Sequence, residues 1–191
     1  MTIQQKNNDD AFTGLEAAIV LIAFVVVAAV FSYVVLGAGF YTTGKAQEAV
    51  YTAIQQGTSN IQMAGMVYGL TGSDTATQIN QIQFSVILAP GATTMDLSVM
   101  KLVFSTPSSY PVIYTYDAAT EPTGTKFSAL RDGVTPTASL GQQQQVRIAF
   151  MIDPAVPKNT MMNFEIRPPV GAALPFTKVT PPEVTRVNVL Y

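Results

Sequence analysis

The sequence contains no cysteine, no histidine and no tryptophan among its 191 residues. Without cysteine there is no disulfide, thiolate metal ligand or cysteine nucleophile, and without histidine there is no imidazole base or Ser-His-Asp triad. Only 12% of the residues are charged, against about 25% in a typical soluble domain. The formal net charge of −2, without a basic cluster, argues against a nucleic-acid surface. These absences exclude many of the common kinds of catalytic and metal site.

The few charges leave a long stretch of the chain uncharged. No charged residue lies between Glu16 and Lys45, a gap of 28 positions, and residues 17–36 are almost all apolar. About 20 apolar residues span the hydrocarbon core of a bilayer, where only a helix satisfies its own backbone hydrogen bonds as a single segment. The sequence therefore predicts a membrane-spanning helix. A secretory signal is the competing interpretation, but its apolar region is shorter, at about 7–15 residues, and ends at a cleavage site.

One carboxylate, Glu16, stands at the edge of this apolar run, after the short polar segment 1–11. A charge inside hydrocarbon costs about 2.5–3.5 kcal/mol even on the mild insertion scale. Glu16 is therefore either an interfacial acid favoured by the dipole at the helix N-terminus, or a group that gains a cationic partner once the helix leaves the lipid.

Glu16 lies within the run FTGLEAAIVLIAFVVVAAV, residues 12–30. This run resembles the N-terminus of archaeal flagellins, or archaellins, which belong to the type IV pilin-like superfamily. Members of this family carry a short leader that a prepilin-type peptidase removes. A small residue precedes the cut, a glycine often stands third in the mature chain, and pilins carry glutamate fifth.

This resemblance implies a processing site formed by Ala11, Phe12 and Gly14. A cut between Ala11 and Phe12 places Gly14 third and Glu16 fifth, and a cut between Asp10 and Ala11 fits this register less well. By analogy with pilins, the new Phe12 amine is expected to offset the Glu16 carboxylate, within one chain or between neighbours. Gly14 is the residue expected to be recognised by the peptidase.

Small and apolar residues continue at helical spacing beyond Lys45. Most lie three or four residues apart, at Ala46, Val50, Ala53, Ile54, Gly57, Ile61, Ala64 and Tyr68. No proline occurs before Pro90, so nothing in this segment forces a break. The pattern predicts one helix from about Thr13 to about Tyr68, roughly 80 Å long.

Small residues along this helix allow neighbouring backbones to approach closely. A helix that is apolar on all sides must be buried on all sides, and outside lipid only other copies of the chain could cover it. If each copy contacts the next through two different surfaces and the copies do not close into a ring, they form a helical polymer. The alternative is a monomeric single-pass anchor. We expect the assembly contacts at Phe12, Glu16, Ala17, Ala18, Ala28, Ala29, Gly37 and Gly39.

After Thr71 the pattern changes to short alternating runs separated by Gly- and Pro-containing turns. The six clearest runs are 82–88, 97–104, 112–116, 146–152, 162–166 and 187–191. This spacing predicts six to eight short strands in an antiparallel sandwich or barrel. The archaellin resemblance implies an immunoglobulin-like β-sandwich. The expected fold class is thus α+β, with a leader at 1–11, an assembly helix at 12–70 and a β-domain at 71–191.

No catalytic or metal site is legible in the second half. Asp117, Glu121, Asp132 and Asp153 supply oxygen atoms of the kind calcium prefers, but they lack the Asp-x-Asp-x-Asp spacing of a calcium loop. No Asn-x-Ser/Thr acceptor for N-glycosylation occurs in the chain. We expect no cofactor and no metal.

Taken with the resemblance, these features predict a structural subunit of the archaeal flagellum, which polymerises through its N-terminal helix into a motility filament. Its expected partners are further copies or related subunits, a prepilin-type leader peptidase and, before assembly, the cytoplasmic membrane. The filament would lie on the outer surface of the cell. The alternatives are an adhesive pilin of the same superfamily and, from another class, an uncut, monomeric, membrane-anchored extracellular binding domain.

Overall fold

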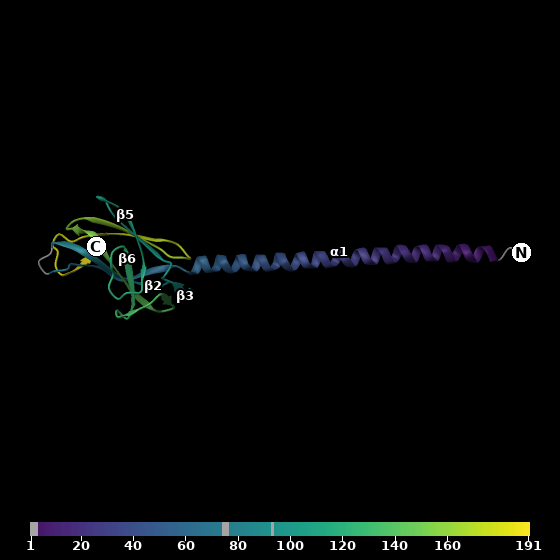
Figure 1. The fold of residues 1–191 in the computed structure, drawn as a ribbon, viewed down its shortest axis with the longest axis horizontal. Coiled ribbons are helices and arrows are strands. Elements are labelled where there is room, and N and C mark those ends of the chain that lie inside the picture. The colour runs from purple at the N-terminus through teal and green to yellow at the C-terminus, as the bar shows by residue number, and fades with distance from the viewer. Residues whose placement is uncertain (1–3, 74–76, 93) are drawn as a thin grey trace. The chain divides into compact units, whose positions relative to one another are not determined.

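The computed structural model describes the backbone of residues 4–73, 77–92 and 94–191, and the side chains of the same residues except 4–12 and 58. One long helix is followed by twelve strands (Figure 1). The chain divides into two compact units, residues 1–51 and residues 52–191. The second unit, which holds all the strands, is referred to below as the β-domain.

The helix α1 runs without interruption over Gln4–Thr58. The β-branched run 25–27 has a modest helix propensity, but a helix pairs every backbone group within itself, which an apolar segment needs wherever water is excluded. The expected helix over the apolar run is therefore present.

The helix ends earlier than its spacing predicted, at Thr58 instead of near Tyr68. Asn60 stops it, because its side-chain amide donates to the Gly57 carbonyl (3.1 Å) and its side-chain oxygen accepts the Ala172 N–H (3.0 Å). The chain then turns into β1 (Ile61–Leu70), so the expected boundary at residue 70 is wrong for the helix. Spacings of three and four among Ile61, Ala64 and Tyr68 are shared by a helix face and by an irregular strand, and pairing with a long sheet decides between them.

The first sheet is almost entirely antiparallel, as predicted. Its strand order is β11-β10-β4-β5-β6-β9-β2-β1-β12, with β7 added to β6, and β5 and β6 are its parallel pair. A two-stranded sheet joins β3 to β8. The remaining bounds are β2 (Gln78–Leu88), β3 (Thr94–Asp96), β4 (Lys101–Thr106), β5 (Ser109–Asp117), β6 (Lys126–Arg131), β7 (Thr135–Pro136), β8 (Ser139–Gly141), β9 (Gln145–Pro157), β10 (Met161–Arg167), β11 (Leu174–Val179) and β12 (Val187–Leu190).

The two ends of this strand order come together. The Val179 N–H, at the end of β11, donates to the Tyr191 carbonyl just after β12 at 2.7 Å. The sheet therefore wraps around one core instead of lying open, which is the sandwich or barrel arrangement that the alternating runs predicted.

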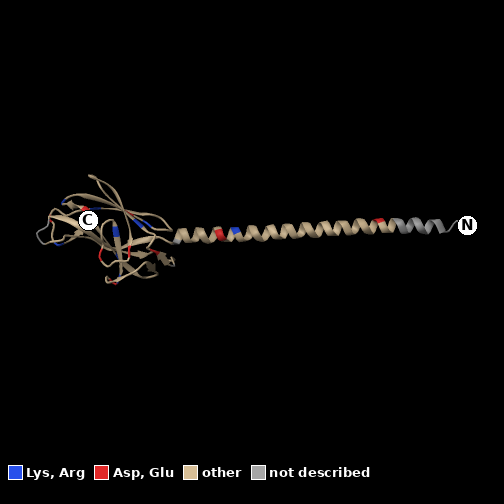
Figure 2. Cartoon of the chain, in the orientation of Figure 1, with Lys and Arg blue, Asp and Glu red and all other residues tan. Residues whose placement is uncertain are grey.

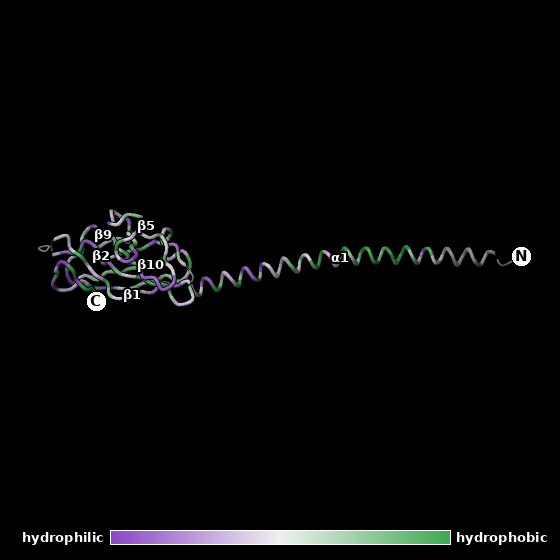
Figure 3. The backbone as a smooth tube through the Cα atoms, turned by 90° about the horizontal axis from the view of Figure 1, so that it is seen from below, coloured by the Kyte–Doolittle hydropathy of each residue, from purple (hydrophilic) through white to green (hydrophobic). Residues whose placement is uncertain are grey.

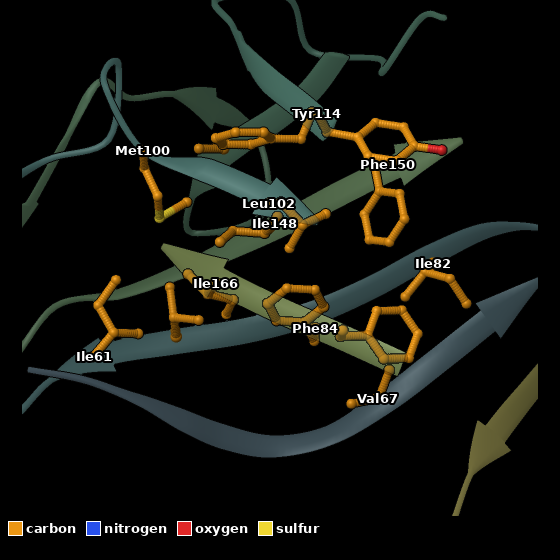
Figure 4. Packing of buried hydrophobic residues seen from close by; sticks show 14 of the residues in the cluster. Ile61, Val67, Ile82, Phe84, Met100, Leu102, Tyr114, Ile148, Phe150 and Ile166 are labelled. Atoms are coloured by element: carbon orange, nitrogen blue, oxygen red, sulfur yellow. The ribbon is translucent and has the colours of Figure 1, made fainter. Parts of the chain in front are cut away.

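Aromatic rings fill the centre of this core. Phe150 on β9 is fully buried, and its ring centroid lies 4.8 Å from that of Tyr114 and 6.0 Å from that of Phe104. Phe164 stacks on Phe176 at 4.9 Å. Figure 4 shows Tyr114 beside Phe150 at one side of the core and Phe84 near Ile166 at the other. The β-domain thus has a continuous core of its own.

Four of the six predicted runs lie wholly within strands, and the run 187–191 extends one residue beyond β12. The run that begins at Leu97 starts too early. The strand β4 begins at Lys101. Residues 97–100 instead form a turn in which the Asp96 carboxylate accepts hydrogen bonds from the backbone N–H and the hydroxyl of Ser98, at 2.8 Å and 2.6 Å. The turn buries Leu97 and Met100. Their apolar side chains therefore resemble the start of a strand in the sequence.

Candidate functional site

The helix α1 presents an apolar surface that nothing else in its unit covers. Every side chain described from Thr13 to Gly57 is exposed. The large hydrophobic side chains among them are between 53% and 79% exposed, with Tyr33 the most exposed and Val20 among the least. Figure 3 shows that the apolar residues concentrate in the half of α1 nearer the N-terminus. The segment Thr13–Gly57 is long and apolar enough to cross a membrane.

Charge is confined to three positions of this helix between residues 13 and 58. They are Glu16 near one end and the pair Lys45 and Glu48 near the other (Figure 2). The Lys45 ammonium lies 2.6 Å from the Glu48 carboxylate, so this pair is neutral within one turn. Within the described part of the chain, no ion pair joins Glu16 to another side chain. Of these three charges, Glu16 is the one that an apolar environment would leave unbalanced.

The hydroxyl groups of Thr42 and Thr43 on α1 are satisfied by the helix itself. The Thr42 hydroxyl donates to the carbonyls of Ala38 (3.0 Å) and Gly39 (2.9 Å), and the Thr43 hydroxyl donates to Gly39 (2.9 Å). Threonine commonly bonds back to the preceding turn in this way. These polar side chains can therefore enter a dry environment without an unpaired donor.

Two of the predicted assembly residues, Ala28 and Gly39, lie on one face of α1. They line a shallow notch together with Ser32, and the rings of Phe31 and Phe40 flank it. Around Gly37 and Gly39 there is open space where a side chain would project. The notch can accept a bulky residue of another helix at close approach. Ala17, Ala18, Ala29 and Gly37 are exposed but lie outside it.

The predicted processing residues lie near the start of α1. The backbones of Ala11 and Phe12 are helical, and their side chains fall outside the described residues. Gly14 is exposed, with no neighbouring atom where a side chain would project. The structure thus places Gly14 on an open helical surface, as the third residue after the expected cut.

The four acidic residues considered as calcium ligands are not gathered into a site. Asp117 forms an ion pair with Lys126 (3.2 Å). Across the residues that the structure describes, no group of three or more acidic side chains could hold a metal ion. Asp153 instead lies near Tyr114, where burial first and this carboxylate second raise the pKa of the phenol to about 12. The raised pKa of Tyr114 therefore follows mainly from its packing in the core.

Comparison with known proteins identifies the family of this chain. The family model for archaeal-type flagellin matches residues 11–178. "Probable flagellin 1" of Archaeoglobus fulgidus is 35% identical over 100% of this chain and 99% of its own length. The 24 kDa flagellin of Methanospirillum hungatei is 88% identical over 32 residues, which are 17% of this chain and 100% of that sequence.

A solved structure extends the likeness over both units. The subunit in the archaeal flagellum of Methanospirillum hungatei matches with a TM-score of 0.72 and 33% identity, over 93% of this chain and 99% of that one. Family model, full-length relative and solved structure all agree. The chain belongs to the archaeal-type flagellin family.

Proposed function

We propose that this chain is a structural subunit of an archaeal flagellar filament and that it polymerises through α1. The observation that carries the proposal is the uncovered apolar surface of this helix, on which 20 large hydrophobic side chains from Leu15 to Ile54 are exposed. Burying such a side chain contributes about 1.5–3 kcal/mol, so the set stabilises a buried state by tens of kcal/mol before the cost of association. Copies of the same helix supply such an environment outside the membrane.

The precursor would first place this helix in the cytoplasmic membrane. The charge-free stretch from Ala17 to Gly44 spans about 42 Å as a helix, which exceeds the hydrocarbon thickness of about 30 Å. Residues 1–11, which are polar, would be removed after Ala11 by a prepilin-type peptidase. The mature chain would then begin at Phe12, and the apolar helix would lie at its very N-terminus.

Cleavage after Ala11 would also supply a partner for Glu16. The new α-amine of Phe12 would lie four residues before the carboxylate, a spacing that places two groups on the same helix face. A carboxylate in an apolar core needs such a cation, within its own chain or from a neighbour. Glu48 needs none, because Lys45 already neutralises it.

Removing each carboxylate in turn tests this role. We expect Glu16→Ala to lower the amount of filament sheared from cells at least 10-fold while the chain remains in the membrane fraction. Glu48→Ala is the matched control, since it removes the other carboxylate that α1 retains after the proposed cut, and it is expected to change the yield much less. Normal filaments from Glu16→Ala would show that this residue is only an interfacial acid.

A further inference from the structure

The β-domain carries an apolar surface that its own core does not use. The strands β1 and β12 are paired antiparallel, with Tyr68 opposite Val189. Five side chains of these strands and their ends point outward, with exposed fractions from 40% (Tyr68, Val189) to 65% (Tyr191). We define the β1–β12 face as Met66, Tyr68, Val187, Val189 and Tyr191.

The face has a sharp polar boundary. Neither Ile61–Leu70 nor Val187–Leu190 contains a charged residue. On the next strand, β2, the residues opposite Tyr68 and Leu70 are Gln83 and Gln81. An antiparallel sheet with one face in water normally alternates apolar and polar residues, as β2 does. In contrast, β1 beside it and β12 at the end of the sheet place apolar residues on both faces, which is the pattern of strands covered on both sides.

A local irregularity of β1 contributes to this face. The register of β1 against β2 shifts between Ala64 and Tyr68, and Gly65 adopts a φ of 84° within this bulge. Met66 lies in this bulge and points outward, 59% exposed, while Val67 next to it is fully buried. The bulge places two more residues on β1 than on β2, so the alternation of inward and outward side chains is the same on both sides of it. Here the bulge adds a large apolar side chain to the face.

We propose that the β1–β12 face docks onto the β-domain of a second copy of this chain in the filament, an inference that rests on the proposed function. The face belongs to the first strand after α1, since β1 begins at Ile61 and α1 ends at Thr58. The surface that pairs β-domains is thus directly continuous in the chain with the helix that gathers the copies. Copies held by α1 meet at a high effective concentration, which makes a weak contact sufficient.

The size of the face fits a contact of this kind. Its five side chains expose on the order of 500 Å², whereas a stable stand-alone interface buries about 800 Å² on each partner. The face is therefore too small to dimerise free β-domains and large enough to add to an assembly already held by α1.

The absence of cysteine from the chain gives a direct test. Val187→Cys places one thiol in the β1–β12 face, and Ile113→Cys, on β5, is the matched control, because the two native side chains are 54% and 51% exposed. Each full-length variant is labelled with a water-soluble maleimide, once in sheared filaments and once as detergent-solubilised subunits. We expect labelling at residue 187 to be at least 10-fold slower in filaments, and labelling at residue 113 to change little.

Equal rates at residue 187 in filaments and in detergent would overturn the inference and leave this face open to other ligands on the filament surface. A second variant needs no thiol. Tyr68→Lys is expected to lower filament yield at least 10-fold, whereas Tyr68→Phe keeps it, and normal filaments from Tyr68→Lys would also overturn the inference. Absence of the unsubstituted chain from filaments would instead overturn the proposed function, so the two failures are distinguishable.

Discussion

A single charge at the centre of α1 should prevent filament formation. Val30 lies 14 residues from Glu16 and 15 from Lys45, or about 21 Å and 22 Å along the helix axis. Neither end of the charge-free stretch is therefore within reach of a lysine side chain at this position. We expect Val30→Lys to cost about 2.5–3.5 kcal/mol for each subunit, which lowers the equilibrium constant for burying one helix about 70- to 400-fold.

The assay for this prediction compares the chain in sheared filaments with the chain retained in membranes, on immunoblots of the same cells. Val30→Leu controls for the position, and Gln47→Lys adds the same charge next to Glu48, in the polar half of the helix. Both controls should leave filaments in place. Unchanged filament yield from Val30→Lys would refute the reasoning, because a core helix without a neutralising partner cannot hold a buried ammonium group.

Three further predictions concern the processing site and the β-domain. Gly14→Trp should leave the leader attached, which is seen as a slower-migrating precursor on a gel. Complete cleavage of this variant would show that the peptidase does not recognise Gly14. Phe150→Ala should lower the free energy of unfolding by about 3–5 kcal/mol, because this ring is fully buried. Urea melts followed by near-UV circular dichroism measure this change. The control Tyr110→Ala, at a side chain that is 93% exposed, should change the free energy of unfolding by less than about 0.5 kcal/mol. Because the pKa of Tyr114 is raised to about 12 in the fold, from 10.0, its contribution to stability is complete below pH 10 and is lost as the pH rises towards 12. The pH dependence of the free energy of unfolding between pH 10 and 12 should weaken in Tyr114→Phe. The same pH dependence in this variant and in the unsubstituted chain would contradict the role of Tyr114.

The helix and most of the sheet could be predicted from the sequence because their patterns are strong. A charge-free apolar run of this length can form few structures other than a helix. In the alternating runs of β2, β5, β9, β10 and β12, the apolar residues lie on the buried face of the strand. Such patterns report burial directly, one residue at a time.

The elements that were missed lack a distinctive period. The strand β6 is buried at four consecutive positions, Phe127 to Leu130, because it is covered on both faces, so its residues do not alternate. The sequence predicted helix over β1 because the strand has apolar residues on both faces and a bulge at Gly65. Its apolar residues are therefore spaced three and four apart, as on a helix. Its placement depends on β2 and β12, which are distant in sequence.

Contacts across long sequence separations also explain what could not be foreseen at the end of α1. Gly171, at a φ of 103°, lies against the end of the helix, where an added Cβ atom would meet the Ser59 carbonyl oxygen at 1.8 Å. The side-chain oxygen of Asn60 accepts a hydrogen bond from the N–H of Ala172, the residue after Gly171. Neither contact has a local signal, because each partner lies more than 100 residues away.

The most direct test of this account is the N-terminal residue of the chain in filaments sheared from cells, read by mass spectrometry. The account predicts a chain that begins at Phe12 and is recovered with the filaments. A chain that begins at Ala11 would contradict the register that places Gly14 third and Glu16 fifth. A chain that still begins at Met1 and is found only in membranes would contradict the filament itself and favour an anchored extracellular domain.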